Sequence, residues 1–347
     1  MRWTGAVACS ALLLLATAFA SPALVEGQTP TPAASFPAGR VSGTITNGTA
    51  GAPGVADVRI QLLALTGDGK VTSTDSTAQD GRFSFAPPAN PNVTYVLRAM
   101  YKGVSYLIDP PILLSPELTT EEREITVYET TDVAPPLRVD STVVSVQGLD
   151  RDLGELSLQR EDQVTNPTDR VYVGSADHVT LRLPAPDGVT GLGATEDLDA
   201  EVRLDGLVAT TTQALRPGQN LVVTRYVVGY DQGADSYRLR VTTALPTDEM
   251  QIWVPVRFVN GVQAGAGAIM GANRTLQGEQ WRVVQRLDAA NEGDSIVASL
   301  SGLTRANESN PFLGFPGAMA ASAVALTAVI VGVVVLSRVR SRLRGLA

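Results

Sequence analysis

Apolar residues alternate with polar ones along several short runs after Gly39. The runs with a period of two are Val41/Ile45, Val58/Ile60/Leu62, Phe83/Phe85 and Tyr95/Leu97/Ala99. This period places one face of an extended strand in a core. Turn signals separate the runs, namely Asn47-Gly48, Asp68-Gly69 and Asp80-Gly81, whose residues tolerate positive φ. With a last strand over 124–128, the pattern predicts an antiparallel β-sandwich over residues 39–131.

A second β-rich unit is expected over residues 139–303, after a linker at 132–138 that contains Pro135-Pro136. Its predicted strands are equally short and cover 141–146, 153–159, 178–183, 221–228, 236–243, 251–259, 281–285 and 295–300. Asn260-Gly261 predicts a hairpin, and the segment 261–271, rich in glycine and alanine, is interpreted as a loop. Because no βαβ repeat is present, the sequence predicts an all-β ectodomain of two consecutive antiparallel β-sandwiches.

Two uninterrupted apolar runs near the ends of the chain predict export and anchoring. Arg2, the apolar residues 6–18 and the small residues Ala18 and Ala20 are typical of a signal peptide over 1–20, followed by a Pro/Thr/Ala-rich leader at 21–38. Residues 317–336 carry no charge and are long enough for one transmembrane α-helix after a polar stalk at 304–316.

A basic tail at 337–347 sets the expected topology, through Arg338, Arg340, Arg342 and Arg344. Arginines that flank a membrane span stay on the cytoplasmic side. We therefore expect a single-pass, type I protein of the cell membrane, with its ectodomain in the periplasm or outside the cell.

Charge and cysteine content narrow the choice of partners. Without Arg2 and the four tail arginines, 22 basic residues face 35 acidic ones, which gives the predicted exported part a net charge of −13. Such a chain repels nucleic acid.

The only cysteine, Cys9, lies in the predicted signal peptide, so the fold must be stabilised by core burial without disulfides.

Four segments of the first unit occur in a characteristic order. They are a Gly-x-Val-x-Gly strand at 39–45, a glycine-led strand at 54–60, an Asp-Gly-x-Phe hairpin at 77–85 and a Tyr-x-Leu strand at 95–99. In this order they resemble the carboxypeptidase regulatory-like family, which has a transthyretin-like (prealbumin-like) sandwich. The resemblance covers about a quarter of the chain and implies a fold and an extracellular accessory role, without implying a reaction.

Catalytic and metal-binding residue sets are difficult to assemble from this sequence. A zinc carboxypeptidase site needs two histidines, and a Ser-His-Asp triad needs one in a suitable setting, whereas the chain holds only His178. His178 is interpreted as a surface or edge residue at the start of a strand. The acidic groups around Asp150 and around Glu201 lack the EF-hand spacing and are interpreted as solvated loops. No cofactor and no metal is expected.

Lysine and aromatic residues supply the remaining candidates. An intramolecular isopeptide bond would need Lys70 or Lys102, but both lie beside turns and are poorly placed. Trp253, Trp281 and Tyr230 are candidate ligand-binding aromatics. Because Trp253 is out of phase with Ile252 and Val254, it is expected to face the opposite side of its strand from them. Packing in a core or at an edge is the favoured interpretation of these rings.

The function expected from the sequence is that of a non-enzymatic binding, scaffold or accessory protein of the bacterial cell envelope, with an envelope protein or a glycan as partner. One alternative is a carbohydrate or cell-wall binding module that uses the aromatics of the second unit. The other is a hydrolase with an unrecognised carboxylate site.

Overall fold

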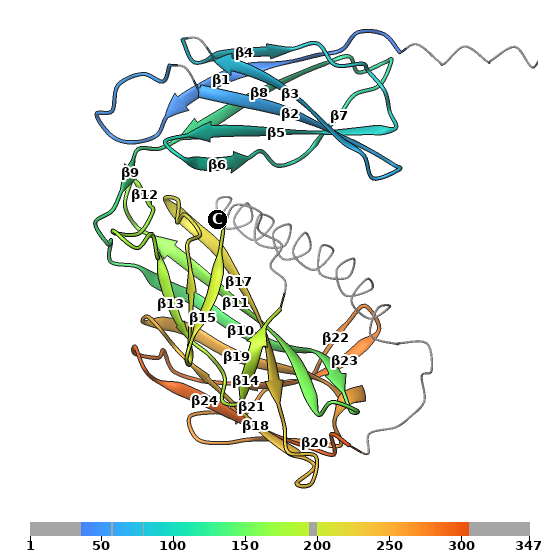
Figure 1. Ribbon diagram of the computed structural model, residues 1–347, viewed down its shortest axis with the longest axis vertical. Coiled ribbons are helices and arrows are strands. Elements are labelled where there is room, and N and C mark those ends of the chain that lie inside the picture. Colours follow the sequence, from blue (N-terminus) through green and yellow to red (C-terminus); the bar gives the residue numbers. More distant parts are fainter. Residues whose placement is uncertain (1–35, 57, 79, 194–199, 305–347) are drawn as a thin grey trace, which may run out of the picture.

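The computed structural model describes residues 36–56, 58–78, 80–193 and 200–304. This part of the chain is all-β, with one short 3-10 turn, η1 (Val256–Phe258), and it forms two β-sandwich units (Figure 1). The first unit comprises the strands up to β8, and the second begins at β10. The predicted signal peptide, leader and transmembrane helix, with Arg338, Arg340, Arg342 and Arg344, lie outside the described residues. Within the described ranges, no helix is long and apolar enough to cross a membrane.

The first unit packs a three-stranded sheet, ordered β4-β1-β8, on a larger sheet, ordered β3-β2-β5-β6 with β7 beside β5. Its strands are β1 (Arg40–Asn47), β2 (Val58–Thr66), β3 (Val71–Ala78), β4 (Arg82–Phe85), β5 (Val93–Tyr101), β6 (Val104–Leu107), β7 (Ile112–Leu113) and β8 (Thr120–Val127). The alternating apolar positions of the sequence form its core: Val41, Ile60, Phe83 and Leu97 are all buried. The turn signals Asp68-Gly69 and Asp80-Gly81 connect β2 to β3 and β3 to β4, with positive φ at Gly69, Asp80 and Gly81.

The second unit contains one eight-stranded sheet, with the path β14-β17-β11-β10-β19-β23-β21 and β22 beside β23, and two three-stranded sheets, β13-β16-β15 and β18-β24-β20. Its strands are β10 (Arg138–Asp150), β11 (Glu155–Asn166), β13 (Leu181–Pro184), β14 (Val189–Leu192), β15 (Val202–Asp205), β16 (Val208–Thr211), β17 (Gly218–Gly229), β18 (Ser236–Thr242), β19 (Thr247–Pro255), β20 (Gly261–Ala264), β21 (Ile269–Met270), β22 (Arg274–Leu276), β23 (Glu279–Gln285) and β24 (Ser295–Ser301).

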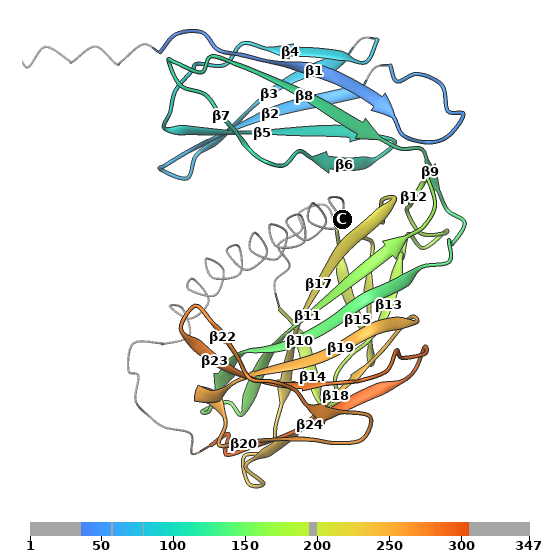
Figure 2. The ribbon, with the colours of Figure 1, turned by 180° about the vertical axis from the view of Figure 1, so that it is seen from behind.

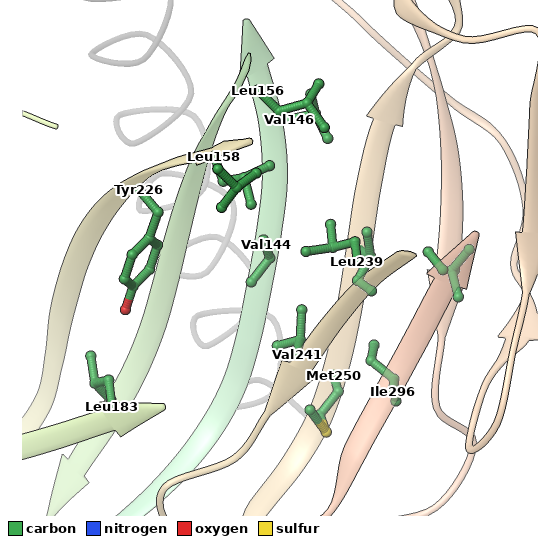
Figure 3. Close-up of a cluster of buried hydrophobic side chains, with 14 of the residues drawn as sticks. Val144, Val146, Leu156, Leu158, Leu183, Tyr226, Leu239, Val241, Met250 and Ile296 are labelled. Atoms are coloured by element: carbon green, nitrogen blue, oxygen red, sulfur yellow. The ribbon is translucent and has the colours of Figure 1, made fainter. Parts of the chain in front are cut away.

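The core of the second unit lies between the eight-stranded sheet and the two smaller sheets. Figure 3 shows Leu158 and Tyr226 of the large sheet in the same buried cluster as Leu239 of β18, Ile296 of β24 and Leu183 of β13. Each of these side chains is buried. The unit is therefore held together by apolar burial between layers, as expected for a chain whose predicted mature part has no cysteine.

Two local predictions for the second unit are wrong. The segment 261–271, interpreted as a loop, contains strands β20 and β21. Asn260-Gly261 does not form a hairpin, because β20 pairs with β24 and η1 separates it from β19. Glycine and alanine weaken a strand only locally, and here the ladder bonds supplied by β24 and β23 outweigh that weak preference.

Strand direction also differs from the antiparallel expectation in three places. β1 runs parallel to β8, β10 runs parallel to β19, and β9 (Thr130–Thr131) runs parallel to β12 (Val171–Tyr172). A period of two shows which face of a strand is buried and carries no information on the direction of its neighbour. The other strand pairs of the described residues are antiparallel.

A junction of three chain segments joins the two units. The parallel pair β9–β12 connects the end of the first unit to a loop that follows β11. Val171 of that loop is fully buried in the core of the first unit, with Val173 and Ala214 packed against the same core. Arg216 donates a hydrogen bond to the backbone oxygen of Ser105 in β6, so a third segment also crosses the junction.

Hydrogen bonds close the junction around Thr49 and Glu129. The Thr49 hydroxyl accepts a bond from the Glu129 backbone N–H and donates one to the Asp169 backbone oxygen, both at 2.9 Å. The Glu129 backbone oxygen accepts a bond from the Val171 N–H at 2.9 Å. Because buried and polar contacts from separate segments meet here, the structure joins its units by more than a single linker.

Candidate functional site

Trp253 and Trp281 lie side by side on the face of the eight-stranded sheet that points away from the core. Ile252 and Val254 are fully buried in the core, so Trp253 between them faces the other side, as its phase in the sequence predicts. β19 and β23 pair Pro255 with Trp281, which makes the two indoles diagonal neighbours. Their ring centroids are 6.3 Å apart and their planes are tilted by 60°. The sequence therefore identified two aromatics that the fold brings together.

Polar side chains surround this pair. The guanidinium of Arg274, on β22, lies 5.0 Å from the Trp253 ring centroid. The Trp253 indole N–H donates a 2.7 Å hydrogen bond to Gln251 Oε1. Nearby on β23, Glu279 pairs with Arg257 at 2.8 Å, and burial raises the pKa of Glu279 although Arg257 lowers it. The Arg274 guanidinium thus covers one face of the Trp253 ring. A ligand would therefore contact the edges of the indoles and the surrounding polar groups.

The same sheet face continues as a row of polar side chains. Trp253 neighbours Ser145 of β10, which lies opposite Gln159 of β11, which in turn lies opposite Arg225 of β17. Arg225 Nε donates a 3.0 Å hydrogen bond to Gln159 Oε1, and Gln159 Nε2 donates a 2.6 Å bond to Glu161. Burial raises the pKa of Glu161, although the bond from Gln159 lowers it. Gln159 itself is buried, and we call the set Trp253, Trp281, Gln251, Arg274, Glu161 and Arg225 the tryptophan surface.

Sequence reasoning missed part of this surface. Gln251 lies two residues before Trp253, a spacing that places both side chains on one face of a strand and could have identified it. Arg274 could not be found, because the sequence predicted no strand at β22.

Tyr230, the third aromatic candidate, lies on the opposite side of the sheet from the two indoles. It follows Tyr226 and Val228 at a period of two, and all three are buried in the core of the second unit. Burial raises the pKa of Tyr230. The fold therefore brings Trp253 and Trp281 together and leaves Tyr230 apart from them.

The candidates for catalysis and metal binding occupy ordinary structural positions. His178 is exposed in a turn with φ of 56°, and the strand after it begins only at Leu181. Asp150 Oδ1 accepts the backbone N–H groups of Asp152 and Leu153 and so caps the β10–β11 turn. Among the described residues, no group of three or more histidine, cysteine, aspartate or glutamate side chains could hold a metal ion.

Lys102, Glu129 and Asn47 lie close together at the junction. These are the residue types that an intramolecular isopeptide bond would need, so the structure bears on that hypothesis. Lys102 Nζ is 3.7 Å from Glu129 Oε2, and Asn47 Nδ2 donates to Glu129 Oε1 at 2.9 Å. Amide formation needs a neutral amine and a carboxyl group that can donate a proton. Here the hydrogen bond from Tyr101 lowers the pKa of Glu129, and the Lys102 side chain is 52% exposed. The arrangement is that of an ion pair.

Comparisons with known proteins do not assign the chain to a family. No protein family and no curated protein matches its sequence. Among solved structures, it is similar to the M1 zinc metallopeptidase of Deinococcus radiodurans, with 13% identity and a TM-score of 0.29. That likeness covers 48% of this chain and 42% of the length of the metallopeptidase chain.

Two further similar structures are major pilins of Corynebacterium diphtheriae, each with 12% identity and a TM-score of 0.20. SpaD is matched over 79% of this chain and 93% of its own, and SpaA over 76% and 84%. Because all three TM-scores are low, these likenesses support no conclusion about the fold or the function of this chain.

Proposed function

We propose that the chain is an exported, membrane-anchored, non-enzymatic binding or scaffold protein of the bacterial cell envelope. In this proposal, residues 317–336 anchor it, the second unit stands next to the membrane, and the first unit is held outward as the recognition module. The resemblance of the first unit to carboxypeptidase regulatory-like domains agrees with an accessory role of this kind.

One geometric observation supports the proposal most directly: the chain enters and leaves the second unit at opposite ends. β10 begins at Arg138, next to the junction, and ends at Asp150. The last described residues lie at this far end, where Arg151 Nε donates to the Leu303 backbone oxygen at 2.9 Å and Thr304 bonds to Asp235. A strand of 13 residues is about 40 Å long, so the unit separates the junction from the anchoring end by about that distance.

The display proposal is tested with two epitope tags and protease added to intact spheroplasts. One tag is inserted between Gly51 and Gly54, in a loop where both glycines have open space around them, and the other follows Ala347. We expect the first tag to be digested, and the second to survive in the membrane fraction. Survival of the first tag with loss of the second would overturn the proposal. Replacing the four tail arginines by glutamine should make a larger share of the chains insert in the opposite orientation; these residues are Arg338, Arg340, Arg342 and Arg344.

The tryptophan surface supports a second candidate, a carbohydrate or cell-wall binding module. Indole rings beside glutamine, glutamate and arginine side chains suit ligands that combine apolar edges with hydroxyl groups. Trp253→Ala should abolish binding to a glycan array if this surface is the binding site. Arg238→Gln, on the other sheet layer, should leave binding unchanged. Equal glycan binding by both variants would exclude the surface.

A further inference from the structure

An open groove of about 500 Å³ lies on the outer face of the sheet β4-β1-β8 in the first unit. Its side chains come from three neighbouring strands and the adjacent β3. The polar residues that line it from β1, β4 and β8 are Arg40, Ser42, Thr44, Arg82, Ser84 and Glu122. No sequence pattern singled them out, because each is an ordinary polar residue on the solvent face of a strand.

Strand register explains why these residues form a groove. Ser42 lies opposite Ser84, and Thr44 lies opposite Arg82, so hydroxyl groups meet in the middle of the face. On the other side, Ser42 neighbours Glu122 in β8. Short hydroxyl side chains therefore form a floor between the longer side chains. The opposite face of the same strands carries buried residues such as Val41 and Phe83, which fixes the orientation of the groove.

The two arginines of the groove are exposed on the solvent face of their strands. Among the described residues, neither Arg40 nor Arg82 makes a side-chain hydrogen bond or ion pair. Some exposed arginines elsewhere do pair, as Arg59 does with Asp75 at 2.7 Å. In a predicted exported part with a net charge of −13, two guanidinium groups without a partner among the described residues form a local positive site at one groove. Guanidinium binds carboxylate or phosphate through paired hydrogen bonds.

Glu122 limits which anions the groove can accept. It is exposed, lies beside Ser42, and makes no ion pair within the described part of the chain. Its charge opposes a densely charged polyanion such as nucleic acid, whose phosphates would lie close to it. A ligand with an isolated acidic group and several hydroxyls avoids this repulsion and can bond to Ser42, Thr44 and Ser84.

The groove lies on the side of the first unit that faces away from the second. In the other sheet of the sandwich, β6 contacts the second unit: the Arg216 guanidinium bonds to the Ser105 backbone oxygen and lies 4.9 Å from the Tyr106 ring centroid. Both ribbon views place β6 toward the second unit and β4 and β1 on the far side (Figures 1 and 2). If the chain is displayed as proposed, the groove is on its outermost face.

We infer that this groove binds an acidic glycan: sugar or polyol hydroxyls contact the serine and threonine floor, and a carboxylate or phosphate of the same ligand contacts Arg40 and Arg82. The outward position of the site rests on the proposed function, whereas binding itself depends only on the groove.

The test measures binding of three soluble probes to the full chain in detergent micelles by isothermal titration calorimetry. The probes are three disaccharides of equal length: cellobiouronic acid with one carboxylate, cellobiose 6′-phosphate with one phosphate, and neutral cellobiose. We expect at least one acidic probe to bind about tenfold more tightly than the neutral one, and its identity shows whether carboxylate or phosphate is recognised. Equal binding of all three, or binding of none, would overturn the inference.

Variants then connect binding to the groove. Arg40→Gln and Arg82→Gln should each weaken binding of the acidic probe about tenfold. Glu122→Gln should strengthen its binding because a repelling charge is removed. Arg238→Gln is the matched control, because Arg238 is an exposed strand arginine of the second unit whose side chain also makes no hydrogen bond or ion pair with any described residue. Far-UV circular dichroism verifies that all four variants fold. Unchanged affinity in both groove arginine variants would refute the site.

The two proposals fail separately. Protease shaving reports on display and does not depend on any ligand, whereas calorimetry on the purified chain does not depend on location. Correct topology without preferential binding of an acidic probe would reject the groove alone. Preferential binding by a chain that proves to face the cytoplasm would reject the display alone.

Discussion

The guanidinium of Arg160 lies inside the second core, where only 3% of its side chain is exposed. Asp162 receives two hydrogen bonds from it, at 2.7 and 3.1 Å, and the backbone oxygens of Pro184 and Thr242 accept bonds from Nη1. Thr142 donates a further 2.6 Å bond to Asp162. Burial lowers the pKa of Arg160, but the charge of Asp162, its hydrogen bonds and the charge of Tyr226 together outweigh burial, so the pKa lies above its usual value. One buried ion pair thus links β11 to strands of both smaller sheets.

Removing one partner of this pair should be costly, because a buried charge is left without compensation. We predict that Asp162→Ala destabilises the second unit by about 3–5 kcal/mol. Trp253 and Trp281 are the only tryptophans outside the predicted signal peptide, so fluorescence during guanidinium chloride denaturation reports on this unit.

Two further variants separate the charge from the hydrogen bond. Thr142→Val removes one bond to Asp162 and should cost about 1 kcal/mol. The double variant Arg160→Met with Asp162→Leu should cost less than Asp162→Ala, because both charges leave the core together. If the double variant is the more destabilised one, the pair contributes net stability, contrary to this account.

At the scale of the strand, Gly43 in β1 and Gly39 just before it permit close contact with neighbouring segments. A Cβ atom at Gly43 would lie 1.8 Å from the backbone oxygen of Arg123 in β8 and 2.9 Å from the Phe83 ring. A Cβ atom at Gly39 would lie 2.8 Å from the Leu114 side chain. The two glycines of the Gly-x-Val-x-Gly segment therefore leave room for neighbouring parts of the first unit that a Cβ atom would displace.

We predict that Gly43→Ala destabilises the first unit by about 3 kcal/mol, because the contact involves rigid backbone that cannot move aside cheaply. For a unit of this size the melting temperature should fall by more than about 10 °C, as measured by far-UV circular dichroism. Gly54→Ala is the matched control, since nothing lies within 4 Å of a Cβ there. A Gly43→Ala protein that melts at the control temperature would contradict the close contact.

Other strands show what a single sequence could not provide. β3 was missed because its residues, Val71 to Ala78, are nearly all small and polar, and it is held by its ladder to β2. Burial of Tyr230 agrees with the packing interpretation of the aromatics, and its period of two from Tyr226 and Val228 could have assigned it to the core. The groove was invisible for a similar reason: Arg40, Ser84 and Glu122 become neighbours only through strand register, which local patterns do not determine.

At the scale of the whole molecule, the junction decides whether the two units move as one body. Glu129 is central to it: its side chain accepts hydrogen bonds from Tyr101 at 2.6 Å and Asn47 at 2.9 Å, while its backbone bonds to Thr49 and Val171. The side chain therefore fixes the position of the backbone segment that pairs with the second unit. The buried Val171 adds an apolar contact that a flexible linker would lack.

Protonation of Glu129 should loosen this junction in acid. The Tyr101 hydrogen bond lowers the pKa of Glu129 from its ordinary value of 4.5. A carboxylate whose pKa is lower in the folded than in the unfolded state stabilises the fold fully above the unfolded value. That stabilisation is lost as the pH falls through the folded value. The junction should therefore be intact at about pH 5–7, which lies above the pKa of an unfolded carboxyl group, and it should weaken below about pH 4.

The measurement is a distance distribution between two spin labels, one in each unit. The chain offers a clean background because its only cysteine, Cys9, lies in the predicted signal peptide. Labels at Ser73→Cys and Ser236→Cys, both exposed, should give a narrow distribution at pH 7 that broadens in acid.

Thr49→Val should broaden it already at pH 7, because the bonds to Glu129 and Asp169 are lost together. Glu129→Gln keeps an acceptor oxygen without a titratable charge, so its distribution should not change with pH. A broad distribution for the unaltered junction at pH 7 would mean that the units move independently, and the first unit would then lack the fixed outward orientation that display at a set distance from the membrane requires.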